Sequence, residues 1–310
     1  MDARDRRTLI GSLWALLILT VLVVLGGAVV RATGSGAGCG PSWPQCVGQI
    51  VPISPGTDTI IEFSHRLATG VLGILAVTVA VLAWRSTSRG DGLRKAMWWV
   101  LGLLTVEALI GRTLVVTGWV GTDASVGRAT IVPLHLVNTF FLLAAIAVAL
   151  HLARGGGRIA PSLASPQGRI VAAMAGGLVV VGATGALNAL ADTVFPVASV
   201  LDGITQELAA TAHFLVRLRT IHPAVAAVVG VGILILAAHP SLDRPDTIHL
   251  VRVIQVTVLA QIGIGVLNIA LLTPLVVQIL HLLAADVVWV ATILLGSRVL
   301  SIRAPVTAVP

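Results

Sequence analysis

The chain has 310 residues, of which 56% are hydrophobic and only 11% are charged, whereas charged residues make up about 25% of a typical soluble domain. Together with the mean hydropathy of +1.00, this composition indicates an integral membrane protein. At about 20 residues per spanning helix, the length leaves no room for a separate soluble catalytic domain. The basic residues lie between apolar segments rather than in one cluster, so the net charge of +7 indicates membrane topology and argues against nucleic-acid binding.

Eight apolar segments have the length that a bilayer core requires, which predicts an all-α membrane protein. The first segment follows three arginines and could also be a cleavable signal peptide. It is long enough to span, however, and Arg31 follows it where a signal peptidase needs small residues, so we expect a retained helix. The predicted spans are 10–30, 61–84, 96–118, 131–152, 169–190, 216–238, 251–271 and 277–297.

The basic residues are distributed unequally between the two sides of the predicted bundle. If the N-terminus is cytoplasmic, six basic residues fall on the outer side: Arg31, Arg66, Arg112, Arg128, Arg217 and Arg219. The other fourteen fall inside: Arg4, Arg6, Arg7, Arg85, Arg89, Arg94, Lys95, Arg154, Arg158, Arg169, Arg244, Arg252, Arg298 and Arg303. This bias predicts cytoplasmic termini and an extracytoplasmic first loop.

Similar motifs recur in the two halves of the chain, at His65 and His222 and again at His135 and His281. They predict two four-helix bundles, and since each has an even number of helices, both insert in the same direction as parallel repeats. The predicted units are an N-terminal bundle at 1–152, a cytoplasmic linker at 153–168 and a C-terminal bundle at 169–310.

These four histidines all fall near the outer ends of even-numbered spans. Two histidines on facing helices of a four-helix bundle are typical of bis-imidazole haem ligation, so His65, His135, His222 and His281 are candidate iron ligands. A lone histidine is more often a packing residue, and a zinc site would need further ligands near each pair. His213 competes with His222 for the ligand role, and the phase of the repeat favours His222.

Three arginines lie at the same outer level as the histidines, namely Arg66, Arg217 and Arg219. They could bind haem propionates by charge-assisted hydrogen bonds. The alternative is that they extend toward lipid phosphate.

Glu62 lies one helical turn before His65, so both side chains share a helix face. The second half has Arg219 at the corresponding position, and an acid beside only one candidate haem site suggests proton transfer or charge stabilisation there. The alternative role for Glu62 is complementing the helix dipole. Glu107, Arg112 and Asp286 also fall within spans, where we expect ion pairs or proton-path residues.

The chain has two cysteines, Cys39 and Cys46, both in the first loop. Two thiols exclude an iron–sulfur cluster or a zinc site that needs four. The extracytoplasmic side permits disulfides, so we expect these cysteines to be joined. A structural role and a redox role both stay open.

The sequence resembles the haem A synthase family, which converts haem O to haem A for cytochrome oxidases. The resemblance covers nearly the whole chain and is most specific in and just after the first loop. The segments that carry it are Gly26 to Gly36, Cys39, Trp43-Pro44, Cys46, Glu62 to Arg66, Gln261 to Asn268 and His281.

The resemblance implies a division of labour between the two bundles. The N-terminal bundle would hold the substrate haem O, and the product haem A, between His65 and His135, with Glu62 catalytic. The C-terminal bundle would hold a haem b cofactor between His222 and His281. The implied reaction oxidises the C8 methyl group of haem O to a formyl group, with water as the oxygen source. Some members carry a second cysteine pair between helices 5 and 6, which this chain lacks.

The resemblance also implies a bacterial plasma-membrane oxidoreductase whose partners are the lipid bilayer, haem O and the farnesyltransferase that makes haem O. The electron acceptor is not identified, and the oligomeric state stays open, a homo-oligomer included. A dihaem cytochrome b-like electron carrier is the main alternative because it would use the same four histidines. A transporter built from parallel repeats is the third hypothesis.

Overall fold

A computed structural model describes residues 3–242 and 245–302 of the chain. Within these ranges eight helical segments are long and apolar enough to cross a membrane, which confirms the predicted all-α membrane class. Arg244 and Arg303, which we assigned to the inner side, lie outside the described residues.

The N-terminal spans are α1 (Ala3–Ala32), α2 (Thr57–Ser86), α3 (Gly92–Val116) and α4 (Val126–Ala153). They are longer than predicted because hydropathy detects only the apolar centre of a helix, whereas the polar ends extend beyond it. Side-chain caps set two of the starts: Asp91 accepts a hydrogen bond from Leu93 N, and Ser125 accepts one from Arg128 N. The loop between α1 and α2 contains a short 3₁₀ helix, η1 (Ser35–Ala37).

The C-terminal half contains α5 (Pro166–Val194), α6 (Val200–Leu208), α7 (Phe214–Leu218), α8 (Ile221–Ala237), α9 (Ile248–Ala270) and α10 (Leu275–Val299). The sequence did not predict α6, which lies in the loop after α5. The sixth span is interrupted between α7 and α8. Pro223 explains the break, because a proline ring clashes with the carbonyl four residues earlier, here that of Arg219. A 3₁₀ helix, η2, occupies Pro240–Leu242.

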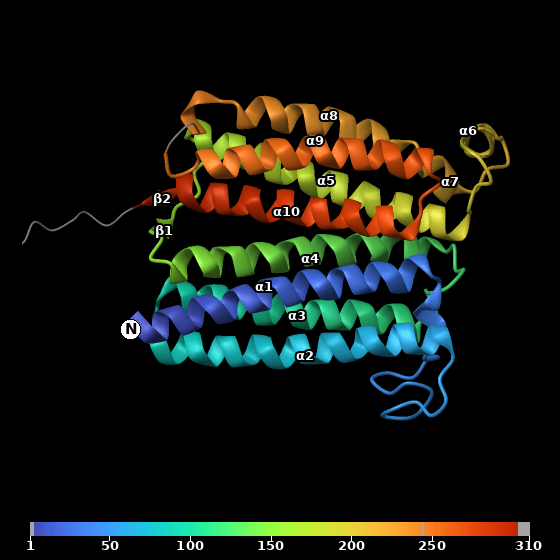
Figure 1. The fold of residues 1–310 in the computed structure, drawn as a ribbon, viewed down its shortest axis with the longest axis horizontal. Helices are drawn as coiled ribbons and strands as arrows, with labels where there is room; N and C mark the ends of the chain where they lie inside the picture. Colours follow the sequence, from blue (N-terminus) through green and yellow to red (C-terminus); the bar gives the residue numbers. More distant parts are fainter. Residues whose placement is uncertain (1–2, 243–244, 303–310) are drawn as a thin grey trace, which may run out of the picture.

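The helices α1 to α4 lie side by side with the group formed by α5, α8, α9 and α10 (Figure 1). The two groups meet where α4 packs against α5 and α10. There Trp289 on α10 stacks on Phe140 of α4 and donates from Nε1 to the Phe140 carbonyl at 2.6 Å. That the two groups are sequence repeats stays a prediction.

The two ends of the bundle carry different segments (Figure 1). At one end are the start of α1 and a two-stranded antiparallel pair, in which β1 (Arg158–Ile159) pairs with β2 (Ser301–Ile302). At the other end are the cysteine-containing loop and α6. Each even-numbered span begins at this second end, which therefore carries the candidate site.

Candidate functional site

The four candidate histidines lie at one level of the bundle. His65, His135, His222 and His281 are eight, nine, eight and six residues from Thr57, Val126, Phe214 and Leu275, where their spans begin. At about 1.5 Å per residue, these offsets differ by only one helical turn. All four side chains are half-buried.

Each half brings its own two histidines together. In the C-terminal pair, His222 and His281, the ring centroids are 6.3 Å apart and the rings are nearly perpendicular. In the N-terminal pair, His65 and His135, the two imidazoles are within electrostatic range of each other. No group of three or more metal-ligating side chains occurs in the described part of the chain.

The C-terminal pair fits a metal ion held between two opposed imidazoles. With a metal–nitrogen bond of about 2.0–2.1 Å on each side, the ring centroids would be roughly 6 Å apart, close to the observed 6.3 Å. Thr184 Oγ1 lies 3.3 Å from His222 Nδ1, so Nε2 is the ring nitrogen without this contact. The chemistry and spacing of this pair therefore fit a bis-histidine haem.

Three of these rings lie directly against the backbone of a neighbouring helix, at a glycine. A Cβ atom on Gly27 of α1 would lie 3.2 Å from His65 Cε1, and one on Gly265 of α9 would lie 3.2 Å from His281 Cε1. At Gly185 of α5 the distance to His222 Cε1 would be 2.9 Å, too short for real atoms. Glycine at these positions thus provides the space that the imidazoles occupy.

His213 does not belong to either pair. It is the N-cap of α7, where Nδ1 accepts a hydrogen bond from Leu215 N at 3.3 Å. Its ring lies between Phe195 and Phe214, with centroid distances of 4.9 and 4.5 Å. The histidine that lies beside His281 is His222; its role as the ligand stays a prediction.

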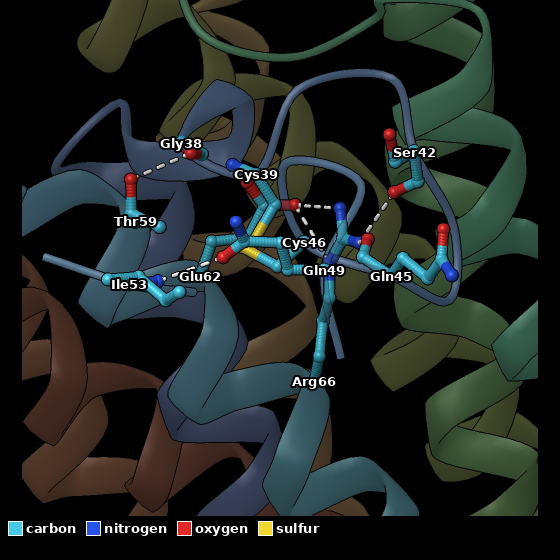
Figure 2. The surroundings of a disulfide bond; sticks show 10 residues. All are labelled: Gly38, Cys39, Ser42, Gln45, Cys46, Gln49, Ile53, Thr59, Glu62 and Arg66. Carbon is cyan, nitrogen blue, oxygen red and sulfur yellow. Dashed lines mark hydrogen bonds and ion pairs between the residues drawn. A yellow bond between two sulfur atoms is a disulfide. The ribbon is translucent and has the colours of Figure 1, made fainter. Parts of the chain in front are cut away.

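Glu62 is buried and faces the loop between α1 and α2 (Figure 2). Its Oε2 accepts a hydrogen bond from Cys39 N at 2.7 Å, and its Oε1 pairs with the guanidinium of Arg66. Arg66 in turn donates to the carbonyls of Ser42 and Gln45, at 2.7 Å each. The carboxylate is therefore held in a fixed position one helical turn from His65.

The three candidate arginines all have intramolecular partners. Arg66 uses all but one of its N–H donors on Glu62 and the loop. Arg219 is buried, pairs with Asp192 at 2.9 Å and donates to two carbonyls at the end of α5. Arg217 is exposed and donates to the Ala210 carbonyl at 2.5 Å. Propionate binding by these arginines stays a prediction.

The acids within the spans have different surroundings. Glu107 on α3 contacts His135, with 3.0 Å between its Oε1 and Nδ1. Sequence reasoning missed this contact, because no spacing rule relates a residue of α3 to one of α4. Arg112 is exposed. Asp286 is buried, and neither of its carboxylate oxygens has a hydrogen-bond partner among the described residues.

The predicted disulfide is present between Cys39 and Cys46, and both cysteines are fully buried. It closes a short loop that a backbone hydrogen bond from Val47 N to the Cys39 carbonyl also stabilises, at 2.9 Å. Since Cys39 N donates to Glu62, the covalent link fixes one partner of the acid.

The fold and site together define a multi-pass membrane protein with a histidine pair in each half. The family COX15-CtaA, described as cytochrome oxidase assembly protein, matches residues 12–293. The chain belongs to this family.

Individual relatives match different shares of the chain. A Thermus thermophilus protein named protoheme IX farnesyltransferase is 39% identical over 300 residues, which are 94% of this chain and 48% of that protein. The chain thus spans about half the length of this relative. Proteins named heme A synthase match over shorter regions. That of Shouchella clausii is 40% identical over 98 residues (32% of this chain and 33% of that protein), and that of Alkalihalophilus pseudofirmus is 33% identical over 138 residues (44% of each).

Replacing both Cys39 and Cys46 by serine should loosen the loop that holds Glu62. For a sequence separation of 7, the chain-entropy estimate for the lost cross-link is about 2–3 kcal/mol in the free energy of unfolding. Hydrogen exchange followed by mass spectrometry should show faster exchange in residues 36–50. The α4 segment serves as the internal control. Unchanged exchange in the loop would show that Arg66 and Glu62 hold it without the disulfide.

Proposed function

We propose that the protein is a haem A synthase that oxidises the C8 methyl group of haem O to a formyl group. The observation that carries this proposal is the presence of two histidine pairs at one level of a COX15-CtaA chain; among the described residues, only the N-terminal pair has a carboxylate paired with one of its histidines, Glu107 with His135. One histidine pair would bind a resident haem cofactor. The other pair would bind a haem substrate through the same kind of histidine ligation. The relatives named heme A synthase support the assignment.

His222 and His281 are the residues that would hold a haem b cofactor. Their centroid spacing of 6.3 Å supports this role. When bound, haem b supplies one-electron transfer. The protein's contribution is to hold the two imidazoles apart at the correct distance, with Gly185 and Gly265 giving them room.

The substrate haem O would bind between His65 and His135. A groove of about 350 Å³ between α1 and α2 reaches His65 and is lined mainly by apolar residues. Because exposed Leu22 and Ile60 border it, the groove faces the bilayer. A membrane-dissolved haem with a long isoprenoid chain could reach His65 by this route.

Glu62 is the proposed catalytic acid–base residue. Conversion of a methyl group and one water to a formyl group releases four protons and four electrons, so a base is needed near the porphyrin edge. The Arg66 guanidinium and Cys39 N–H fix the position of the Glu62 carboxylate. An external acceptor must take the electrons.

We also propose that the farnesyltransferase which forms haem O is a partner. In the Thermus thermophilus relative, a segment similar to this chain makes up about half of a protein named protoheme IX farnesyltransferase. If the two activities are joined in one polypeptide, the poorly soluble haem O has a shorter path from one site to the other. Association of two separate proteins would have the same effect.

The functional test is haem extraction and chromatography from cells that express the protein with the farnesyltransferase. The wild type should yield haem A. The Glu62→Gln variant removes charge and basicity but keeps size, so we expect normal haem content and haem A formation lower by on the order of 10²–10³. A wild type that binds haem but forms no haem A would favour the dihaem electron carrier, and normal activity of Glu62→Gln would reject its catalytic role.

We also propose that the protein lies in the bacterial plasma membrane. The disulfide loop would be outside the cell, and both ends of the described chain would be inside. The distribution of basic residues supports this orientation. An impermeant maleimide applied to intact cells should label Cys39 and Cys46 only after reduction. Labelling that requires cell lysis would reverse the orientation.

The Gly185→Ala variant should displace the His222 ring, because its Cβ would lie 2.9 Å from Cε1. We expect loss of haem b comparable with that of His222→Ala, measured as haem per protein after purification. Gly176→Ala on the same helix is the matched control, since nothing lies within 4 Å of its Cβ. Full haem content in Gly185→Ala would argue that His222 is not a ligand.

A further inference from the structure

The carboxylate of Glu107 lies at the centre of a polar cluster between α3 and α4. Its Oε1 is 3.0 Å from His135 Nδ1 and accepts a hydrogen bond from Thr139 Oγ1 at 2.5 Å. Its Oε2 accepts a hydrogen bond from Asn138 Nδ2. Ionisable groups within a bilayer are costly unless they are paired, and Glu107 meets this requirement entirely with partners on α4.

The direction of these hydrogen bonds follows from the neighbours. Asn138 Nδ2 also donates to the Leu103 carbonyl at 3.0 Å. A carbonyl can only accept, so the amide nitrogen of Asn138 must face both Leu103 and Glu107. Glu107 is therefore an acceptor at Oε2. Its Oε1 lies 3.0 Å from His135 Nδ1, a close contact that does not have the geometry of a hydrogen bond. Of the two ring nitrogens of His135, Nδ1 is thus the one beside the carboxylate.

The C-terminal half has no equivalent carboxylate among its described residues. In the predicted repeat, Gln261 on α9 corresponds to Glu107, and its Oε1 is buried without a partner in the described part of the chain. No ion pair between a carboxylate and His281 or His222 occurs among the described residues, and His222 Nδ1 lies 3.3 Å from the hydroxyl oxygen of Thr184. The two histidine pairs thus differ in the charge behind their imidazoles.

We propose that Glu107 is a positioning residue for His135: from its place 3.0 Å away it would accept a hydrogen bond from Nδ1–H when Nε2 binds a metal, and so orient the ring and make it a stronger electron donor. The proposal rests on the proposed function, in which His135 is a haem ligand. A hydrogen bond from Nδ1–H to a carboxylate raises the basicity of a ligating imidazole. A more basic ligand stabilises ferric over ferrous iron. Glu107 therefore lowers the reduction potential of the N-terminal haem relative to the C-terminal haem.

This asymmetry favours one direction of electron transfer. With haem bound at both pairs, the C-terminal site would have the higher potential and would be the acceptor for electrons from the N-terminal site. The external acceptor would then remove them from the C-terminal side, and the substrate side would return to its oxidised state.

The test compares the wild type with Glu107→Gln and Glu107→Asp in the full-length protein purified with both sites loaded. Spectroelectrochemical titration gives the potential of each haem, and the C-terminal haem is the internal control. We expect Glu107→Gln to raise the potential of the N-terminal haem alone and Glu107→Asp to restore it in part. Titration of the N-terminal site with ferric haem b as probe should show about 10–100-fold weaker binding to Glu107→Gln.

The outcomes separate this proposal from the proposed function. Equal shifts at both haems, or weaker binding with an unchanged N-terminal potential, would mean that Glu107 has only a structural role. An unchanged potential and unchanged affinity would reject the proposal outright. If the wild-type N-terminal pair binds no haem, the proposed function itself fails, whatever the Glu107 variants do.

Discussion

The structure depends on one constraint: a polar group in the hydrocarbon region must find its partner within the protein. The candidate site satisfies this constraint with short contacts between helices. Arg31 of α1 donates to the Ala189 carbonyl and Thr193 Oγ1 of α5 and to Gln278 Oε1 of α10, at 2.6–2.8 Å. Because the hydrocarbon offers no water as an alternative partner, each such contact also fixes the relative position of two helices.

The same constraint organises the outer end of each half differently. In the N-terminal half, Arg66 and Glu62 fasten the disulfide loop to α2. In the C-terminal half, Arg219 fastens α7 to the end of α5 through Asp192. An acid thus faces the loop beside one histidine pair, whereas a cation ends the short helix beside the other. The two groups of helices therefore place groups of opposite charge, Glu62 and Arg219, beside their histidine pairs.

The spans, the histidine pairs and the disulfide could be predicted because each depends on a one-dimensional signal: apolar length, spacing along the chain and compartment chemistry. The partners of Glu62 and Glu107 could not. The spans are apolar nearly all round, so periodicity does not indicate which face of α3 meets α4. The contact between Glu62 and Cys39 N depends on the path of the loop. The interruption of the sixth span near Arg219 depends on the ring of Pro223, which a hydropathy profile does not detect.

The Arg31 bridge has a consequence for separating the two halves of the chain. Its guanidinium belongs to the first group of helices, but its acceptors belong to the second. A half expressed alone would leave this half-buried cation without these partners, at an energetic cost. This bridge therefore links the stability of the two groups of helices.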